Sequence, residues 1–558
     1  MSAGRPGRRI SAGVLIALAA AFLSGCPRPA PPAPDGGARP PASAPHPADD
    51  GPVRGGTLKI ATEAPVAGDP LGLEEAIVRP DPSWSLVYRG LVRLEGGRLV
   101  GDLARDVRIE RAGEAVVVRL RLDGARFDGG APVTAADVRR SLSLYLSPFY
   151  TGAFRDHLSA LEGSSAYRSR GDEAALAVAE EGDAVVLRAR TPTALFFRAL
   201  QAPIFPAAAL PVPDGRAAVR AFVDRIRAGE VPGTGPYRVA EAGPGRLVLV
   251  RAETPEGRAA LLDRVEIATV EPGATPEGAD VLIRLRAGER PEGRWSEDRA
   301  PLPYVLFLAF DVRRTARELR QAATHLDRTT LAEALQAAGF RARPEAAYGP
   351  PGLWTEAADP GGGTARSAGR PVGETGGEKR NAGKAPADAG GPGALSLAYD
   401  RDHPFGAALA PAIVSALQAS GWSIAGEGLP REAFYAKVMA GEGSPAFLWP
   451  LADPDVVGEW WRLLGTPHDV DRLGLNVMHF SDPVVDQALS AAYRAIPGTE
   501  DGAVLRQAFE RIAAAAPLVP LVRPEAVVWV REGVHVGLPA LGRRPPVERW
   551  WKAEKEGR

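Results

Sequence analysis

The chain has 558 residues, with 67 basic and 68 acidic side chains and a formal net charge of -1. This balance creates no broad electrostatic field, so nucleic acid and anionic lipid surfaces are not expected as partners. The hydrophobic fraction of 45% is that of a globular protein, and the length suits roughly three domain-sized units.

Residues 1–25 have the layout of a secretory signal peptide. Three arginines precede an apolar run at 10–23, and the small residues Ser24 and Gly25 follow. The apolar run is shorter than the roughly 20 residues that a membrane-spanning helix needs. We therefore expect this segment to direct export rather than to anchor the chain.

Cys26 is the only cysteine in the chain, and it ends the sequence Leu-Ser-Gly-Cys. That sequence resembles the bacterial lipobox, in which the acylated cysteine becomes the first mature residue. No disulfide can form within the chain, and an unpaired thiol would be a liability in an exported protein. The alternative is an unmodified cysteine in a cleaved peptide. We predict lipidation of Cys26, since two or three acyl chains hold firmly where one holds only marginally.

Residues 26–52 are rich in proline, alanine and glycine and have almost no apolar bulk. Such a segment cannot bury enough surface to offset its chain entropy, and its prolines keep it extended. It is therefore predicted to be a tether between the lipid and the folded body.

The folded part is predicted to begin with a strand at 57–62. Alternating apolar residues at 116, 118, 120 and 122 predict a strand with one buried face. A helix should follow, capped by Thr134 with Asp137 three residues later and ended by Pro148.

The rest of the chain interleaves strands and helices, which predicts an α/β or mixed α+β class. Further strands are predicted at 184–189, 246–251, 304–310, 395–399, 446–449 and 526–530. Further helices are predicted at 316–325, 329–338, 405–420, 483–495 behind the cap Asp482, and 504–515.

Residues 355–394 are rich in glycine and alanine and contain almost no large apolar side chain. This composition is typical of a surface insertion. The Gly383-Lys384 pair within it does not form a phosphate loop, because the glycine spacing is wrong and no serine or threonine follows.

The sequence contains no positive indication of an enzyme, a metal site or a cofactor. Its seven histidines are scattered singly, and no two have the spacing that places two ligands on one helical face. No Gly-x-Ser-x-Gly motif is present, and a catalytic pair of carboxylates could arise only through the fold.

Several stretches, taken in order, resemble one family. They are "RGGTLKIAT" (54–62), "DPL" (69–71), "LVYRGLVRL" (86–94), "LARDV" (103–107), "RFDGGAPVTAADVRRSL" (126–142), "GTGPYRV" (233–239), "LLDRVEI" (261–267), "LAFDV" with "LRQAATHLDRTTLAEAL" (308–335) and "AAAAPLVPLV" (513–522). This ordered set is similar to the extracytoplasmic solute-binding proteins of peptide ABC transporters, of the dipeptide and oligopeptide type. Taken singly, each motif is explained by a structural role in a turn or in the core, so the motifs identify the fold rather than ligand contacts.

The resemblance implies a periplasmic-binding-protein-like fold of two lobes, with an extra domain in the first lobe and two hinge crossovers. By analogy, the first lobe comprises 53–285 with a return of the chain at 525–558, and the second lobe comprises 286–524. The crossovers are expected near 300–310 and 518–528. The implied partners are a small solute, an ABC permease and, through lipid only, a membrane; the protein is expected to be a monomer.

The resemblance also implies a ligand site between the lobes. In the second lobe, Phe447 and Trp449 would lie on a contacting strand, and Asp453 would meet the ligand's α-amino group, with Asp455 as its substitute. The alternative is that Asp453 is only a turn residue before proline and does not contact the ligand.

In the first lobe, the segment 62–71 with Asp69 would face the ligand. Trp84 is a candidate for the wall of the ligand site, and the alternative is that it packs in the core.

The main hypothesis is therefore a lipid-tethered protein that captures a peptide or similar solute for an ABC permease, without making or breaking a bond. An accessory or sensory protein of the same fold, with a non-peptide ligand and no dedicated transporter, is the alternative. An anchored hydrolase would require a perturbed pair of carboxylates or a nucleophile with its base.

Overall fold

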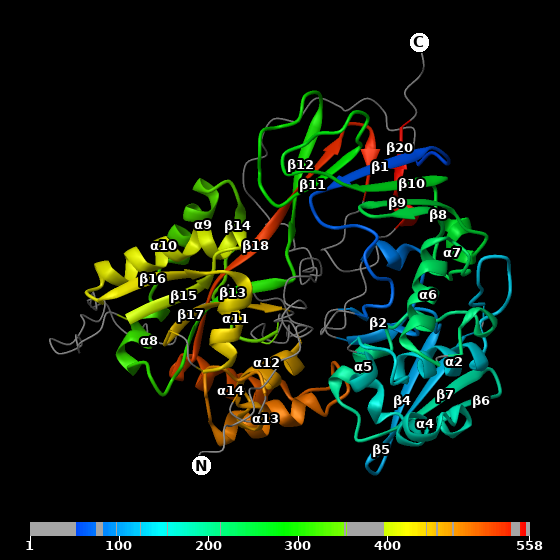
Figure 1. Ribbon diagram of the computed structural model, residues 1–558, viewed down its shortest axis with the longest axis horizontal. Coiled ribbons are helices and arrows are strands. Elements are labelled where there is room, and N and C mark those ends of the chain that lie inside the picture. Colours follow the sequence, from blue (N-terminus) through cyan, green and yellow to red (C-terminus); the bar gives the residue numbers. More distant parts are fainter. Residues whose placement is uncertain are drawn as a thin grey trace, which may run out of the picture.

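The structure is a computed structural model that describes residues 52–73, 82–95, 98–122, 124–152, 154–212, 214–350, 353, 395–441, 444–452, 456–470, 474–536 and 547–553. Figure 1 shows two bodies, with residues of the N-terminal half on the right and most of the later residues on the left. Cys26, nearly all of the predicted tether and the predicted insertion lie outside the described residues.

One large sheet runs through both bodies, in the strand order β16-β15-β17-β13-β18-β11-β1-β10-β9-β8, and β12 and β14 also pair with β18. On one side of β18 (Leu518–Arg531) lie β13 (Tyr304–Phe310), β17 (Ala446–Ala452), β15 (Leu395–Asp400) and β16 (Ile424–Leu429). On the other side lie β11 (Val281–Arg284), β1 (Thr57–Thr62), β10 (Arg264–Thr269), β9 (Arg246–Arg251) and β8 (Tyr237–Gly243). The strand β18 therefore belongs to both halves of the sheet.

The chain crosses between the bodies on two paired segments. β12 (Trp295–Pro301) pairs with β18 from Glu525 to Arg531, and β13, which follows directly, pairs with β18 from Leu518 to Val522. Between these pairings the Leu302 N–H donates to the Pro524 carbonyl at 2.8 Å. The two crossovers expected from the sequence thus lie side by side as an antiparallel pair. β14 (Arg341–Pro344) covers part of β18 as a further partner.

A separate antiparallel sheet of four strands, in the order β4-β5-β7-β6, forms the extra domain beside the first lobe. Its strands are β4 (Asp106–Ala112), β5 (Ala115–Arg121), β6 (Val178–Glu181) and β7 (Ala184–Arg190). Around it lie β2 (Val92–Glu95), β3 (Arg98–Gly101), α2 (Ala135–Leu146), α3 (Phe154–His157), α4 (Ser164–Arg170), α5 (Ala194–Ala199), α6 (Arg216–Arg227) and, near β8, α7 (Pro255–Ala259). The apolar residues at 116, 118, 120 and 122 are all buried, which confirms the predicted alternation.

Helix α2 begins with the predicted capping box. The Thr134 side chain accepts a hydrogen bond from the Asp137 N–H, and the Asp137 carboxylate accepts one from the Thr134 N–H at 2.8 Å. The other carboxylate oxygen of Asp137 accepts from the Ala207 N–H at 2.7 Å. Asp137 therefore both caps the helix and attaches it to the chain that follows α5.

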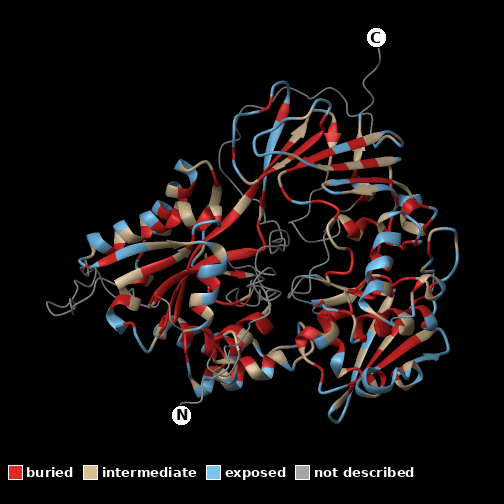
Figure 2. Ribbon diagram, viewed as in Figure 1, coloured by how far each residue is buried: buried red, intermediate tan, exposed pale blue. Residues whose placement is uncertain are grey.

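The second lobe carries helices on both faces of its sheet, as Figure 2 shows by the buried strands between partly exposed helices. Side chains at alternate positions of β13 enter two different apolar clusters. One face is covered by α8 (Arg317–Thr324), α9 (Arg328–Ala337) and α10 (Pro404–Ala419). The other is covered by α11 (Arg431–Met439), α12 (Val457–Leu464), α13 (Pro483–Tyr493) and α14 (Gly502–Ala515). The short strands β19 (Val534–His535) and β20 (Trp551–Lys552) end the described chain.

The five helices predicted after residue 310 agree with α8, α9, α10, α13 and α14 to within two residues at each end. The strand predicted at 526–530 was too short, because β18 begins at Leu518. The interleaved elements confirm the predicted α/β, mixed α+β class. In the part of the chain that the structure describes, no helix is both long and apolar enough to cross a membrane.

We expect Asp137→Ala to lower the free energy of unfolding of the extra domain by about 1 to 2 kcal/mol, because the partly buried N–H groups of Thr134 and Ala207 lose this acceptor. Asp172→Ala is the matched control, since Asp172 is exposed and makes no capping hydrogen bond with its side chain. Denaturant unfolding followed by hydrogen exchange of α2 measures the difference. Equal stability of the two variants would show that the capping box is dispensable.

Candidate functional site

The segment after β1 is fixed to the first lobe by its own side chains. The two carboxylate oxygens of Glu63 accept hydrogen bonds from the N–H groups of Gly273 and Leu285, each at 2.9 Å. Farther along, the Gly68 carbonyl accepts from the Trp84 indole at 3.3 Å and from Arg227 at 3.2 Å. The predicted ligand-facing segment is therefore held in one conformation by contacts from distant parts of the lobe.

Asp69 holds the turn that ends this segment. One of its carboxylate oxygens accepts from the Leu71 N–H at 2.9 Å, and the other accepts from the Leu73 N–H at 2.6 Å. The side chain is half-buried, and Leu71 is fully buried. In this structure Asp69 shapes the backbone, and its direct contact with a ligand stays a prediction.

Trp84 lies in the first-lobe core with no exposed surface, and its ring centroid lies 6.3 Å from that of Tyr88. This position agrees with the core alternative for Trp84. Its indole N–H holds the Gly68 carbonyl of the predicted ligand-facing segment in place.

Phe447 and Trp449 lie on β17 and point into the second-lobe core. Their exposed fractions are 2% and 5%, and both belong to the cluster beneath α11 and α12. The Trp449 ring packs edge-on against Tyr435, with centroids 5.7 Å apart. Both side chains support β17 from one side, and a ligand contact by either stays a prediction.

The backbone of β17 is paired on both sides only at its beginning. β15 pairs with β17 at two positions, Leu397 with Ala446 and Ala398 with Phe447, whereas β13 pairs along the whole strand. From Leu448 to Ala452, the described strands therefore cover one edge of β17 and leave the other open. Asp453 and Asp455 directly follow this edge, but both lie outside the described residues.

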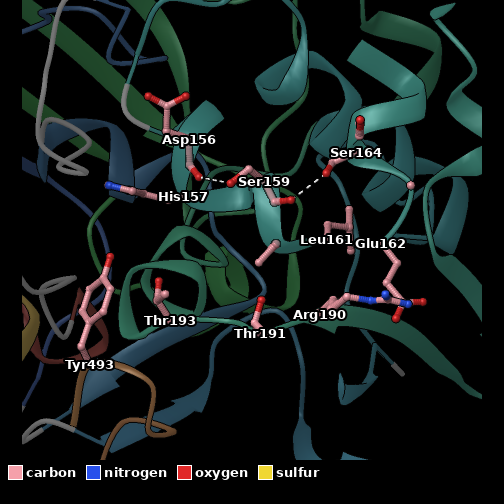
Figure 3. Close-up of a pocket in the computed structure, with 13 residues that line it drawn as sticks. Asp156, His157, Ser159, Leu161, Glu162, Ser164, Arg190, Thr191, Thr193 and Tyr493 are labelled. Carbon is pink, nitrogen blue, oxygen red and sulfur yellow. Dashed lines mark hydrogen bonds between the residues drawn. The ribbon is translucent and has the colours of Figure 1, made fainter. Parts of the chain in front are cut away.

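A polar pocket of about 640 Å³ lies elsewhere, in the extra domain. Figure 3 shows its wall, which includes Asp156, His157, Glu162, Arg190 and Thr193, together with Tyr493 from α13 of the second lobe. None of the predicted site residues lines it. This pocket could not be predicted from the sequence. Its wall combines scattered polar residues between 156 and 193 with Tyr493, which is some three hundred positions later in the chain.

The charges near this pocket act on His157. Burial, reinforced by the neighbouring cations Arg462 and Arg198 and opposed by Asp156, lowers the pKa of His157 to about 4. His157 is therefore neutral near pH 7. Among the described residues, no group of three or more His, Cys, Asp or Glu side chains is arranged to hold a metal ion.

Two α/β lobes connected by a pair of crossing strands, with an extra domain on the first lobe, define a two-lobed solute-binding protein. The family model "Bacterial extracellular solute-binding proteins, family 5 Middle" matches residues 98–467, which is more than half of the chain. The chain belongs to this family, as the resemblance of its motifs predicted. A comparison with curated proteins returned no match.

Solved structures share the fold along nearly the whole chain. The periplasmic murein tripeptide binding protein MppA, in an unliganded open form, aligns with a TM-score of 0.66 at 16% identity, covering 90% of this chain and 99% of its own. AppA from Bacillus subtilis, in complex with a nonapeptide, gives 0.59 at 17% identity, covering 90% and 100%. NikZ from Campylobacter jejuni, in complex with Ni(L-His), gives 0.60 at 16% identity, covering 89% and 99%. These likenesses confirm the predicted two-lobed fold.

We expect Asp69→Ala to loosen the segment before residue 74, because two main-chain N–H groups lose their acceptor. Hydrogen exchange at Leu71 and Leu73 should rise several-fold, and Asp69→Asn, which keeps one acceptor oxygen, should show a smaller increase. Unchanged exchange in Asp69→Ala would mean that the turn does not depend on this carboxylate.

Proposed function

We propose that the protein is a lipid-anchored, extracytoplasmic binding protein that encloses a peptide or similar small solute between its lobes and delivers it to an ABC permease. Membership in family 5 supports the extracytoplasmic solute-binding role. The proposal that the ligand is a peptide rests on the open edge of β17, which lies beside the crossing strands.

An open strand edge suits an extended peptide. Its C=O groups, and its N–H groups except at Pro450, which has none, can pair with the main chain of a ligand of any sequence, while the ligand's side chains occupy tolerant, hydrated pockets. The first-lobe segment at 62–71, with its fixed backbone, is proposed as the opposing wall. Affinity would then come mainly from the backbone, and sequence preference would be broad.

Asp453 is proposed as the partner of the ligand's α-amino group, with Asp455 as its substitute. Either carboxylate follows the open edge within three residues, so it would lie beside the end of an added strand. A charge enclosed between closed lobes needs a counter-charge, and a free amine supplies one.

The fold also supports a second candidate, an accessory or sensory binding protein with a non-peptide ligand. Solved structures of the same fold include AgaA with agropinic acid and a periplasmic EDTA-binding protein, EppA, at 20% and 15% identity. A single non-peptide compound recovered from the protein would favour this candidate.

Capture is proposed to proceed without catalysis. Closure of the lobes about the crossing strands would remove water from the ligand, and the closed form would report occupancy to the permease. No bond is made or broken, so the ligand should leave the protein unchanged.

The ligand can be identified by denaturing the detergent-solubilised lipoprotein and analysing the released molecules by mass spectrometry. A mixture of short peptides with free amino ends is the expected result. Asp453→Asn should then lower peptide affinity on the order of tenfold or more, whereas Glu432→Gln, a loss of the same charge at an exposed position of the same lobe, should not. Equal affinities in the two variants would remove Asp453 from the site.

Lipid attachment is tested separately. Cys26→Ala should move the protein from the membrane to the soluble fraction, and the N-terminal peptide of the unaltered protein should carry the mass of its acyl chains. A variant that remains membrane-bound, or an N-terminal peptide without acyl mass, would contradict the anchor.

A further inference from the structure

The polar pocket of the extra domain has one wall that is fixed by its own contacts. Gly163 has a φ of +85°, and a Cβ at this position would lie 1.8 Å from the Ala175 carbonyl oxygen, so the position requires glycine. The Ser164 hydroxyl donates to the Ser159 carbonyl at 2.7 Å, and the Ser159 hydroxyl donates to the Asp156 carbonyl, as Figure 3 shows. These contacts hold the wall in a single conformation.

A second wall begins at the end of β7. Thr191 has a φ of +45°, in the left-handed region, where a β-branched side chain is strained. Its N–H donates to the Glu114 carbonyl at 3.0 Å, which holds the residue in this conformation. Strained backbone of this kind is concentrated at functional sites. Thr193, which precedes α5, makes no capping hydrogen bond with its side chain, so the helix does not occupy its hydroxyl.

The second lobe supplies a third wall through Tyr493 on α13. Its ring lies against Gly458 of α12, where a Cβ would come within 3.2 Å of the ring. One residue later, the Arg494 carbonyl accepts a hydrogen bond from Arg111 of β4 at 2.9 Å. In Figure 3 the Tyr493 hydroxyl and the His157 ring lie on the same side of the pocket. Contacts from both lobes therefore place this tyrosine.

Several lining groups have hydrogen-bonding atoms that the described protein leaves unused. The Nδ1 atom of His157 is buried and has no hydrogen-bond partner among the described residues. Its pKa of about 4, lowered mainly by burial, keeps the ring neutral near pH 7, with one nitrogen that donates and one that accepts. Within the part of the chain that the structure describes, the Arg190 guanidinium makes no ion pair or hydrogen bond. The hydroxyls of Ser165, Thr191 and Thr193 add further donors and acceptors.

Other classes of ligand fit this lining less well. A multiply charged anion would meet the carboxylates of Asp156 and Glu162 beside the single cation Arg190. An apolar group would find little apolar surface beyond Ala160 and Leu161. The described residues hold no group of three or more metal-ligating side chains. A neutral solute with many hydroxyl groups fits best, because each hydroxyl both donates and accepts a hydrogen bond.

We propose that this pocket is a second binding site, separate from β17 and the segment at 62–71, and that it takes a short neutral oligosaccharide. Its volume of about 640 Å³ lies within the usual range for small-molecule sites. The sugar hydroxyls pair with Arg190, His157 and the hydroxyls of the walls, and the Tyr493 ring covers an apolar face of one sugar. The site goes beyond the proposed capture function and does not depend on it.

Calorimetric titration of the full-length protein tests the site, with maltotriose, cellotriose and triacetylchitotriose as probes, in a detergent that has no sugar headgroup. We expect at least one of these trisaccharides to bind. Arg190→Gln should weaken that binding at least about tenfold, because it removes a charged hydrogen-bond donor. Arg121→Gln is the matched control, since it removes the same charge from an exposed position at the other end of the same sheet, and it should bind as the unaltered protein does.

Hydrogen exchange locates the bound trisaccharide. We expect slower exchange at 156–165 and at 190–193 when the trisaccharide is added, and no change at 62–71. Thr193→Val keeps the shape of the side chain and removes only its hydroxyl, so it tests the site with little risk to folding. It should weaken binding about two- to tenfold, the effect of one lost hydrogen bond.

Three outcomes would overturn the proposal. The first is that none of the three trisaccharides binds, and the second is that Arg190→Gln binds as well as Arg121→Gln. The third is slower exchange at 62–71 and in β17 instead of the pocket walls, which would place the sugar in the proposed capture site. Peptides released on denaturation bear on the capture function alone, so the two proposals can fail independently.

Discussion

The pairing of β18 with strands from both lobes is the interaction on which the rest of the structure depends. Its first residues complete the second-lobe sheet beside β13, and its last residues complete the first-lobe sheet beside β11 and β12. Because the second crossover is hydrogen-bonded to the first, the link between the lobes is a narrow ribbon of two crossing segments, and β14 pairs with its β18 edge from Val522 to Glu525. Such a ribbon can bend or twist while each lobe keeps its own core, which is the geometry of hinge closure.

The lobes contact each other both around β18 and between α5 and α12, and these two sets of contacts differ in kind. Around β18 the lobes share main-chain hydrogen bonds and a nearly continuous run of buried side chains, which cannot be exchanged for water without loss of the fold. At α5 and α12 they share an ion pair between Arg198 and Glu459, with a nitrogen–oxygen distance of 3.6 Å.

Local patterns in the sequence predicted the elements that are amphipathic by themselves. β5 was found from its alternation, and α2 from the Thr134 capping box. The first half of β18 was missed because Pro520 and Pro524 interrupt it, and prolines argue against a central strand. β12 was missed because four of its seven residues are exposed, so it has no continuous apolar pattern.

The resemblance placed Asp69 on the segment after β1 and Phe447 and Trp449 on the strand that is β17, and the contact of these segments with a ligand stays a prediction. Their side chains, however, bind the backbone or fill the core, which depends on three-dimensional neighbours that no spacing reveals. The pairing of Arg198 with Glu459 could not be predicted from the sequence. Each is a charged residue on a short helix, and the two lie far apart in the chain.

The position of β18 near the end of the chain also determines the order in which the molecule can be assembled. The two halves of the large sheet lack the strand that joins them until residues 518–531 have been synthesised, although most of both lobes precedes these residues. The extra domain, whose four strands are contiguous between residues 106 and 190, has no such dependence. Folding can begin there, whereas the two halves of the large sheet are joined only once this late segment is present.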